Sequence, residues 1–243
     1  MSPARKAVVG VAVVASAMLV FFAWGWFRDS SLVKVRHVEI TGVSNSPDAA
    51  AIRRELGDTA RGMTTLHIDR GALDHAVSAY SIVRSVSASG NFPSTLRVEV
   101  HEYAPVAALT GPDGRAVPVA FDGTLLPRVA KTKLPTVAVT AAPEHDGFES
   151  ERVRVLVRVL AGAPAPLRAQ LDRAYVDKER GILVAMRDGP TLELGTGARL
   201  EAKWASATRV LAAPSSSGAD EIDVRLPERP SATGFASTQN PQL

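Results

Sequence analysis

Charged residues are absent from one long stretch near the start of the chain and recur regularly after it. The uncharged run extends from Ala7 to Phe27 and is dominated by alanine, valine and aromatic residues. At about 1.5 Å per residue, a helix of this length spans about 30 Å, which is the thickness of the hydrocarbon core of a bilayer. We therefore predict a transmembrane helix over residues 7–27.

The residues that flank the run predict its orientation. Basic residues at positions 5 and 6 favour a cytoplasmic segment over residues 1–6 and an extracytoplasmic remainder. Trp24 and Trp26 are then expected at the outer interface, as membrane anchors. The alternative is a cleavable signal peptide, because residues 15–17 form an A-x-A pattern. Cleavage there would leave an exposed apolar segment at the new N-terminus, so we favour the uncleaved anchor.

Residues 35–103 have the pattern of a small α+β unit. Apolar positions alternate with polar ones at Val38 and Ile40, and again from Leu96 to Val100, as in half-buried strands. A helix is expected from the Ser-Pro-Asp signal at 46–48 to Gly57, and a second one carries an apolar stripe at helical spacing. The order strand, helix, helix, strand, strand predicts a sheet with helices on one face.

Residues 104–229 combine short strands, Asp-Gly turns and two longer amphipathic segments. These segments, 149–162 and 200–211, predict helices, and Trp204 falls on the apolar stripe of the second one as a core anchor. A last strand over Glu221–Leu226 is expected to place Ile222, Val224 and Leu226 on one face. We predict a β-rich mixed α/β domain with a largely antiparallel sheet, followed by a disordered tail over residues 230–243, where apolar residues are almost absent.

Composition and motifs argue against most kinds of chemistry. The net charge of +3 gives no basis for nucleic-acid binding, and the absence of cysteine removes disulfides, thiol nucleophiles and cysteine-ligated zinc. The five histidines show no metal-ligand spacing, and no acyl-transfer or phosphate-binding motif is complete. We therefore expect no catalytic residues, no cofactor, no metal and no small-molecule substrate.

Three stretches together resemble the bacterial cell-division family FtsQ/DivIB. They are VRHVEITG from Val35, NFPSTLRVEVHEYAPVAAL from Asn91, and LGTGARLEAKWASATRVL from Leu194 followed by EIDVRLPERP from Glu221. Their order is similar to the family's opening strand, closing strand and link, and last helix and strand. The resemblance covers nearly the whole chain and implies a POTRA-like βααββ domain over 35–103 and an FtsQ-type domain over 104–229.

The resemblance also implies a function. It implies a non-catalytic scaffold of the divisome in the plasma membrane at the septum, bridging early division proteins to septal peptidoglycan synthesis through FtsB- and FtsL-like partners. A partner segment is expected to add a strand to a free sheet edge formed by Ile222, Asp223, Val224 and Arg225. In the alternative, Ile222 and Val224 are core residues of an interior strand. An envelope enzyme, such as a peptidoglycan hydrolase, and a POTRA protein of transport or outer-membrane assembly are the other functions considered.

Overall fold

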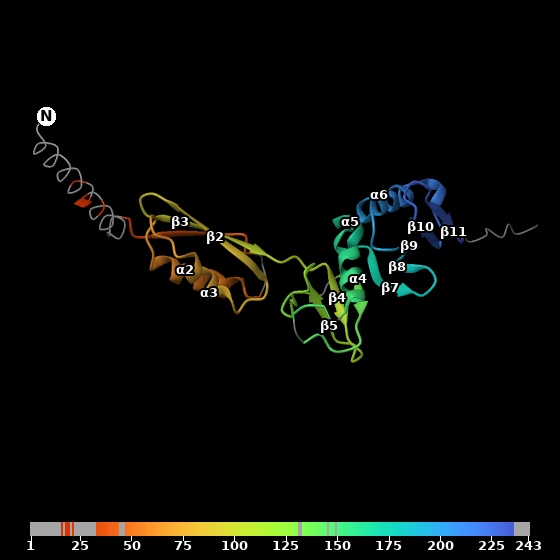
Figure 1. The fold of residues 1–243 in the computed structure, drawn as a ribbon, viewed down its shortest axis with the longest axis horizontal. Coiled ribbons are helices and arrows are strands. Elements are labelled where there is room, and N and C mark those ends of the chain that lie inside the picture. The colour runs from red at the N-terminus through yellow and green to blue at the C-terminus, as the bar shows by residue number, and fades with distance from the viewer. Residues whose placement is uncertain are drawn as a thin grey trace, which may run out of the picture. The chain divides into compact units, whose positions relative to one another are not determined.

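The computed structural model describes residues 33–43, 47–130, 133–144, 146–148 and 150–235, with Ser16, Met18, Leu19 and Phe21 as single positions. The chain divides into two compact units, Met1–Tyr103 and Ala104–Leu243 (Figure 1). Among the described residues, no helix has both the length and the apolar character needed to cross a bilayer. Apart from the four single positions, the predicted helix over 7–27, with Trp24 and Trp26, lies outside the described residues.

The first unit is a three-stranded sheet with two helices. Its strand β3 is central, with β1 parallel on one side and β2 antiparallel on the other. In chain order the elements are β1 (His37–Thr41), α2 (Ala49–Arg61), α3 (Arg70–Val77), β2 (Val83–Asn91) and β3 (Thr95–Glu102). The α+β class and the element order predicted for this unit are confirmed.

The alternation along β3 creates the core of the first unit. Leu96, Val98 and Val100 are buried, whereas Arg97 and Glu99 between them are exposed. The helices cover the apolar face of the sheet with their own buried side chains, which are Ile52, Leu56, Leu73 and Val77. On the opposite face, Arg97 forms an exposed ion pair of 3.1 Å with Glu39 of the neighbouring strand.

Helix α2 does not end at Gly57, contrary to the sequence-based prediction. It continues to Arg61, and Gly62 takes the C-cap position. A helix tolerates one glycine because the cost is only about 1 kcal/mol relative to alanine. Ala60, which is fully buried one turn later, keeps the helix packed beyond that point.

The second unit is built around an eight-stranded sheet with the order β11-β10-β9-β8-β7-β6-β4-β5. Helices α4 and α6 provide most of the helical residues of this unit (Figure 1). The elements are β4 (Ala107–Thr110), β5 (Ala116–Val119), β6 (Thr136–Ala138), α4 (Glu151–Ala161), α5 (Ala165–Arg168), β7 (Leu171–Asp177), β8 (Gly181–Met186), β9 (Thr191–Gly195), α6 (Leu200–Leu211), the 3₁₀ turn η1 (Pro214–Ser216), β10 (Glu221–Asp223) and β11 (Ser231–Thr233).

The sheet is more mixed than the largely antiparallel one that was predicted. The hairpins β4/β5, β7/β8, β8/β9 and β10/β11 pair antiparallel, but β4/β6, β6/β7 and β9/β10 pair parallel. Two of the parallel pairs have a helix in their connection, α4 between β6 and β7 and α6 between β9 and β10. Such a helix carries the chain back to the end of the sheet at which the previous strand began, so the next strand runs parallel to it.

Trp204 anchors the core of the second unit, as its position in the apolar stripe predicted. Its side chain is 1% exposed, and its indole Nε1 donates a hydrogen bond of 3.0 Å to the carbonyl of Val159 on α4. Helices α4 and α6 are therefore joined through the buried Trp204 side chain. The start of α4 is capped separately, because the Ser150 hydroxyl accepts a hydrogen bond from the main chain of Val153.

The predicted disordered tail over residues 230–243 is wrong at its beginning. Ser231–Thr233 form strand β11, which pairs antiparallel with β10 in a register that places Ile222 opposite Ala232. Main-chain pairing orders this short segment although its composition is polar, and Ala232 packs against the core. Residues 236–243 lie outside the described part of the chain.

Candidate partner-binding edge

Strand β11 is one of the two outermost strands of the large sheet. Its inner side pairs with β10, and no strand described in the structure pairs with its outer side. An edge strand of this kind presents main-chain donors and acceptors that another chain can use. β11 is therefore a candidate site for the addition of a strand.

At the opposite end of the sheet, other residues of the chain already pair with the outermost strand. This strand, β5, contains Pro118, which has no N–H to donate. The Pro118 carbonyl already accepts a hydrogen bond of 2.8 Å from Leu126, and Val119 forms a bridge with Leu125. The chain itself thus covers β5, so of the two ends β11 is the one suited to a partner strand.

Of the four residues predicted as the partner edge, two lie one strand inside the edge and the other two follow that strand. Ile222 and Asp223 belong to β10, which has β9 on one side and β11 on the other, so the free edge expected there is not found. Ile222 and Val224 are fully buried, and the main chain of Val224 donates to Glu193 on β9. An alternating apolar pattern is common to interior and edge strands, which is why the sequence did not distinguish them. A contribution of these residues to partner binding stays a prediction.

Sequence reasoning missed the residues of β11 itself. A signal was present, because the two prolines at 227 and 230 mark a turn after a predicted strand. Gly234 follows β11 with φ of +74°, and a Cβ at this position would lie 2.8 Å from the Asp220 side chain. The prolines before the segment and the glycine after it mark it as a short returning strand, although Ser and Ala are not typical strand residues.

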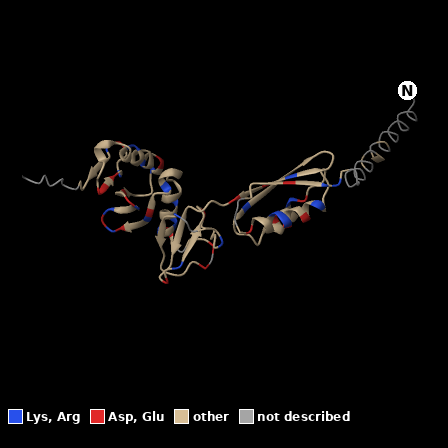
Figure 2. Cartoon of the chain, turned by 180° about the vertical axis from the view of Figure 1, so that it is seen from behind, with Lys and Arg blue, Asp and Glu red and all other residues tan. Residues whose placement is uncertain are grey.

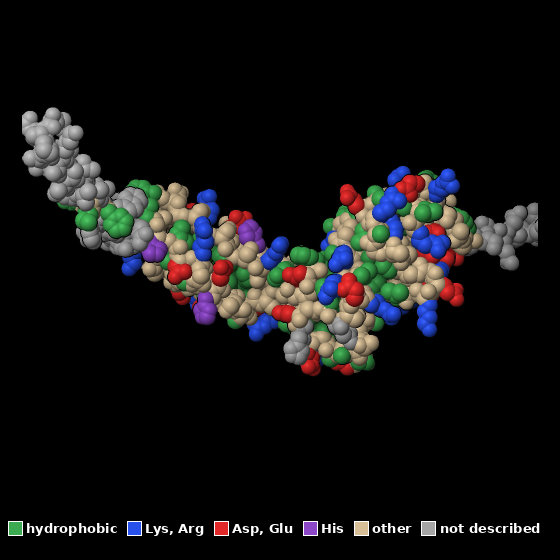
Figure 3. Space-filling model, in the orientation of Figure 1, with side chains coloured by type: hydrophobic (Ala, Val, Ile, Leu, Met, Phe, Trp, Pro, Cys, Tyr) green, Lys and Arg blue, Asp and Glu red, His purple; other side chains and the backbone are tan. Residues whose placement is uncertain are grey.

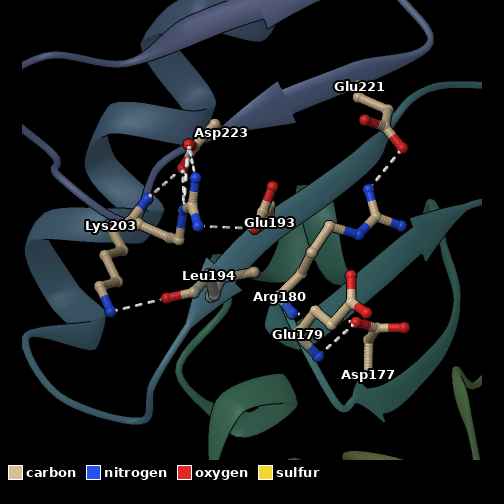
Figure 4. Close-up of polar contacts among 9 residues, drawn as sticks. Asp177, Glu179, Arg180, Glu193, Leu194, Lys203, Glu221 and Asp223 are labelled. Carbon is tan, nitrogen blue, oxygen red and sulfur yellow. Dashed lines mark hydrogen bonds and ion pairs between the residues drawn. The ribbon is translucent and has the colours of Figure 1, made fainter.

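A network of charged side chains lies on β9, on β10 and in the turn before β8, beside the edge (Figure 4). The Arg225 main chain and guanidinium both donate to the Asp223 carboxylate, at 2.8 Å each. The same guanidinium lies 3.2 Å from the carboxylate of Glu193, which the strand register places next to Asp223. Arg225 therefore bridges two neighbouring carboxylates that would otherwise repel each other.

Ion pairing lowers the pKa of Asp223 and raises the pKa values of Arg180 and Arg225. Burial acts to raise the pKa of the Asp223 carboxyl, but hydrogen bonds from Arg225 outweigh it and leave the pKa below its ordinary value. Hydrogen bonding to Glu221 at 2.7 Å raises the pKa of Arg180. These groups are paired within the chain, which is the arrangement of a structural network.

Lys203 is a buried cation at the base of this network. Its ammonium donates a hydrogen bond of 2.7 Å to the carbonyl of Leu194 (Figure 4). A second hydrogen bond, of 2.9 Å, goes to the carbonyl of Thr196. Desolvation is the largest cause that lowers the pKa of Lys203, followed by the charge of Arg199. These hydrogen bonds hold the end of β9 against α6, so the role of Lys203 is to position the strand that supports β10.

Two exposed apolar side chains lie at the ends of the β10/β11 ribbon. Leu226 is 63% exposed and follows β10, whereas Phe235 is 48% exposed and follows β11. Because the two strands are antiparallel, Leu226 and Phe235 lie toward opposite ends of the ribbon. The alternation had predicted Leu226 on the same face as Ile222 and Val224. Leu226 is instead exposed, because it opens a turn in which its carbonyl accepts a hydrogen bond of 2.9 Å from the main chain of Arg229.

The described residues hold no cluster of three or more histidine, cysteine or acidic side chains that could bind a metal. The second unit has a pocket of about 240 Å³ lined by Leu109, Val139 and Phe148. Its carboxylate Asp146 accepts a hydrogen bond from the main chain of Leu125 and so supports a loop. The pocket is smaller than most small-molecule sites, which measure about 300–1,000 Å³. The residues that line this pocket do not form a set of nucleophile, general base and electrophilic group of the kind that a catalytic site requires.

Two family descriptions match the two units of the chain. "POTRA domain, FtsQ-type" matches residues 33–103. "Cell division protein FtsQ/DivIB, C-terminal" matches residues 107–225. The second match ends before β11, so the candidate edge lies just beyond the matched residues.

Several curated relatives carry the name "Cell division protein FtsQ". The protein of Mycolicibacterium smegmatis is 24% identical over 92% of this chain, and that of Novosphingobium aromaticivorans is 31% identical over 68%. The chain spans 62% and 49% of the length of these two relatives. The protein of Corynebacterium glutamicum is 25% identical over 84% of this chain and 88% of its own length. With both units matched in order, the chain belongs to the FtsQ/DivIB family of cell-division proteins.

Proposed function

We propose that the protein is a non-catalytic scaffold of the division machinery that is anchored in the plasma membrane and captures a partner strand at β11. Family membership supports a role in division. The anchor would be the uncharged run 7–27, with Trp24 and Trp26 at the outer interface and both described units on the extracytoplasmic side. The protein would then hold its partner at the outer face of the membrane at the septum.

The single observation that carries the binding proposal is that no strand among the described residues pairs with the outer side of β11. A segment that adds to this strand gains main-chain hydrogen bonds, and side chains at alternate positions provide specificity. Leu226 and Phe235 offer apolar contacts near the two ends of the ribbon. The sheet behind the edge is held by buried side chains and by the Arg225 network, so little ordering is required on the scaffold side.

The partner is proposed to be a small membrane protein of the FtsB or FtsL kind. This part of the proposal comes from the family resemblance. The physical requirement is an extended segment with free main-chain groups and apolar residues spaced to reach Leu226 and Phe235. If these partners bind the septal wall-synthesis complex at the same time, the protein would bridge early division proteins to that complex.

The test is affinity capture of the full-length protein from solubilised membranes. The double variant Leu226→Ala/Phe235→Ala is expected to recover at least about tenfold less FtsB- and FtsL-like protein, because interface anchors of this size contribute about 1–2 kcal/mol each. Ala232→Pro is expected to reduce recovery further, because proline interrupts the main-chain pairing of β11.

Phe121→Ala provides the matched control. Phe121 is 50% exposed and follows β5, at the opposite end of the same sheet. Near-UV circular dichroism and the emission of Trp204 would show that each variant is folded. Unchanged recovery by the folded Ala232→Pro variant would exclude strand addition at β11.

A further inference from the structure

Three segments of the first unit meet at one end of its sheet. Residues 33–36 lead into β1, residues 63–67 connect α2 to α3, and residues 90–94 form the β2–β3 turn (Figure 1). Main-chain hydrogen bonds join them, from Thr65 to Val33 at 2.8 Å and from Arg36 to Ser94 at 2.8 Å. We refer to these three segments as the Phe92 end.

The Phe92 end exposes apolar side chains that the fold does not use. Phe92 is 66% exposed and Leu66 is 37% exposed, and they belong to two different segments of this end. The backbones beneath them are tightly packed, since a Cβ added at Gly90 would lie 2.0 Å from the Thr65 carbonyl oxygen. The two side chains thus stand on a rigid base rather than on loose loops. Exposed apolar groups on such a base indicate a contact with a membrane or another molecule.

The position of this end in the chain favours the membrane. Val33 lies six positions after Phe27, the last residue of the uncharged run. Because an extended chain spans at most about 3.6 Å per residue, the Phe92 end is held within about 22 Å of the end of that run. The exit of the unit is at the opposite end of the sheet, because β1 and β3 run parallel and Tyr103 follows β3.

The charges around this end also suit a lipid surface. Lys34 and Arg36 are exposed in the first of the three segments. The exposed Arg61, just before the second segment, is paired with Asp58 at 2.7 Å. Cations beside apolar side chains are typical of surfaces that bind anionic lipid headgroups, and the attraction is effective within about 10 Å.

We propose that the Phe92 end rests on the outer surface of the bilayer, with Phe92 and Leu66 in the interfacial zone and Lys34 and Arg36 among the headgroups. This inference rests on the proposed membrane anchor. It adds that the first unit docks on the lipid and is held by more than its tether. Such docking would fix one end of the unit at the membrane.

The test uses tryptophan emission in the full-length protein, reconstituted in vesicles of phosphatidylcholine and phosphatidylglycerol with brominated chains. Trp24 and Trp26 are replaced by phenylalanine, and Phe92→Trp provides a reporter on an exposed aromatic position. We expect blue-shifted emission from this reporter, and strong quenching by bromines placed near the headgroups. Raising the phosphatidylglycerol fraction should increase the quenching, and the Lys34→Gln/Arg36→Gln variant should abolish that dependence.

The matched control is Tyr103→Trp in the same background, which places the reporter after β3, at the opposite end of the same sheet, and should not be quenched. Trp204, 1% exposed, contributes a constant signal that a parent without either reporter would measure. If Trp24 and Trp26 of the original chain are quenched but the reporter at 92 is not, lipid docking is wrong while the anchor stands. If neither is quenched, the anchor itself fails. A photo-crosslinker at position 92 that yields a protein adduct in cells instead of lipid adducts would also overturn the proposal.

Discussion

Arg225 occupies a position that one glycine makes possible. Gly195 at the end of β9 has φ of +68°, and a Cβ there would lie 2.9 Å from the Arg225 side chain. The stem of Arg225 can therefore pass over β9 while its guanidinium reaches Asp223 and Glu193. The half-buried Asp223 and the nearly buried Glu193 can lie side by side because the guanidinium of Arg225 pairs with both carboxylates.

This arrangement predicts a dependence of stability on acid. The Asp223 carboxyl has a pKa below its ordinary value of 3.8 in the folded protein, so it contributes stability above that value. The contribution is lost as the pH falls through the lowered folded pKa. Asp223→Asn should therefore destabilise the second unit by about 1 kcal/mol at neutral pH, and its stability should fall less steeply below about pH 4.

With Trp24 and Trp26 replaced by phenylalanine, urea unfolding monitored by Trp204 emission at several pH values would measure this difference. Asp172→Asn is the control, because Asp172 is an exposed residue of β7 in the same sheet. An equal acid dependence for the Asp223→Asn variant and the unmodified protein would show that the pairing with Arg225 is too weak to matter.

At the scale of single elements, two glycines of the first unit lie in opposite environments. A Cβ at Gly57, inside α2, would meet only the flexible end of Arg61 at 3.8 Å, whereas one at Gly90 would collide with the Thr65 carbonyl. Gly57→Ala should therefore raise the free energy of unfolding by about 0.5–1 kcal/mol. Gly90→Ala should lower it, because backbone atoms cannot move aside easily. Thermal unfolding of both variants, followed by circular dichroism at 222 nm, would test this. A loss of stability in the Gly57→Ala variant would contradict the space seen at this position.

The same elements show what the sequence could and could not predict. The strands and helices with strong apolar periodicity, such as β3 and the helix of Trp204, were predicted because burial of one face dictates their pattern. The end of α2 was missed because a glycine is a weak stop signal when the packing continues. β11 was missed because its three residues have no side-chain pattern of their own, and only the flanking prolines and glycine mark it. The partner edge was thus assigned to β10, whose pattern is stronger, and not to its neighbour.

At the scale of the whole molecule, the two units have separate cores. The large apolar cluster that includes Leu192, Trp204 and Ile222 contains only residues of the second unit. The first unit buries its own set around Leu96 and Val98. Units with separate cores are expected to unfold as separate cooperative transitions.

The positions of the tryptophans make this separation measurable. The chain has three tryptophans, and Trp204 is the one that follows the uncharged run. With Trp24 and Trp26 replaced by phenylalanine, emission reports on the second unit alone, whereas circular dichroism reports on both. Leu96 and Leu192 are each fully buried on a strand, so Leu→Ala at either position should cost about 2–5 kcal/mol in its own unit.

Leu96→Ala should therefore shift part of the circular-dichroism transition to lower urea and leave the Trp204 transition in place. Leu192→Ala should shift the Trp204 transition to lower urea and leave the part of the circular-dichroism transition that belongs to the first unit unchanged. If Leu96→Ala also moved the Trp204 transition, the two units would be coupled in stability. A mutation in the first unit would then reach the candidate edge at β11 through the fold itself. Independent transitions would instead mean that the two units can lose stability separately.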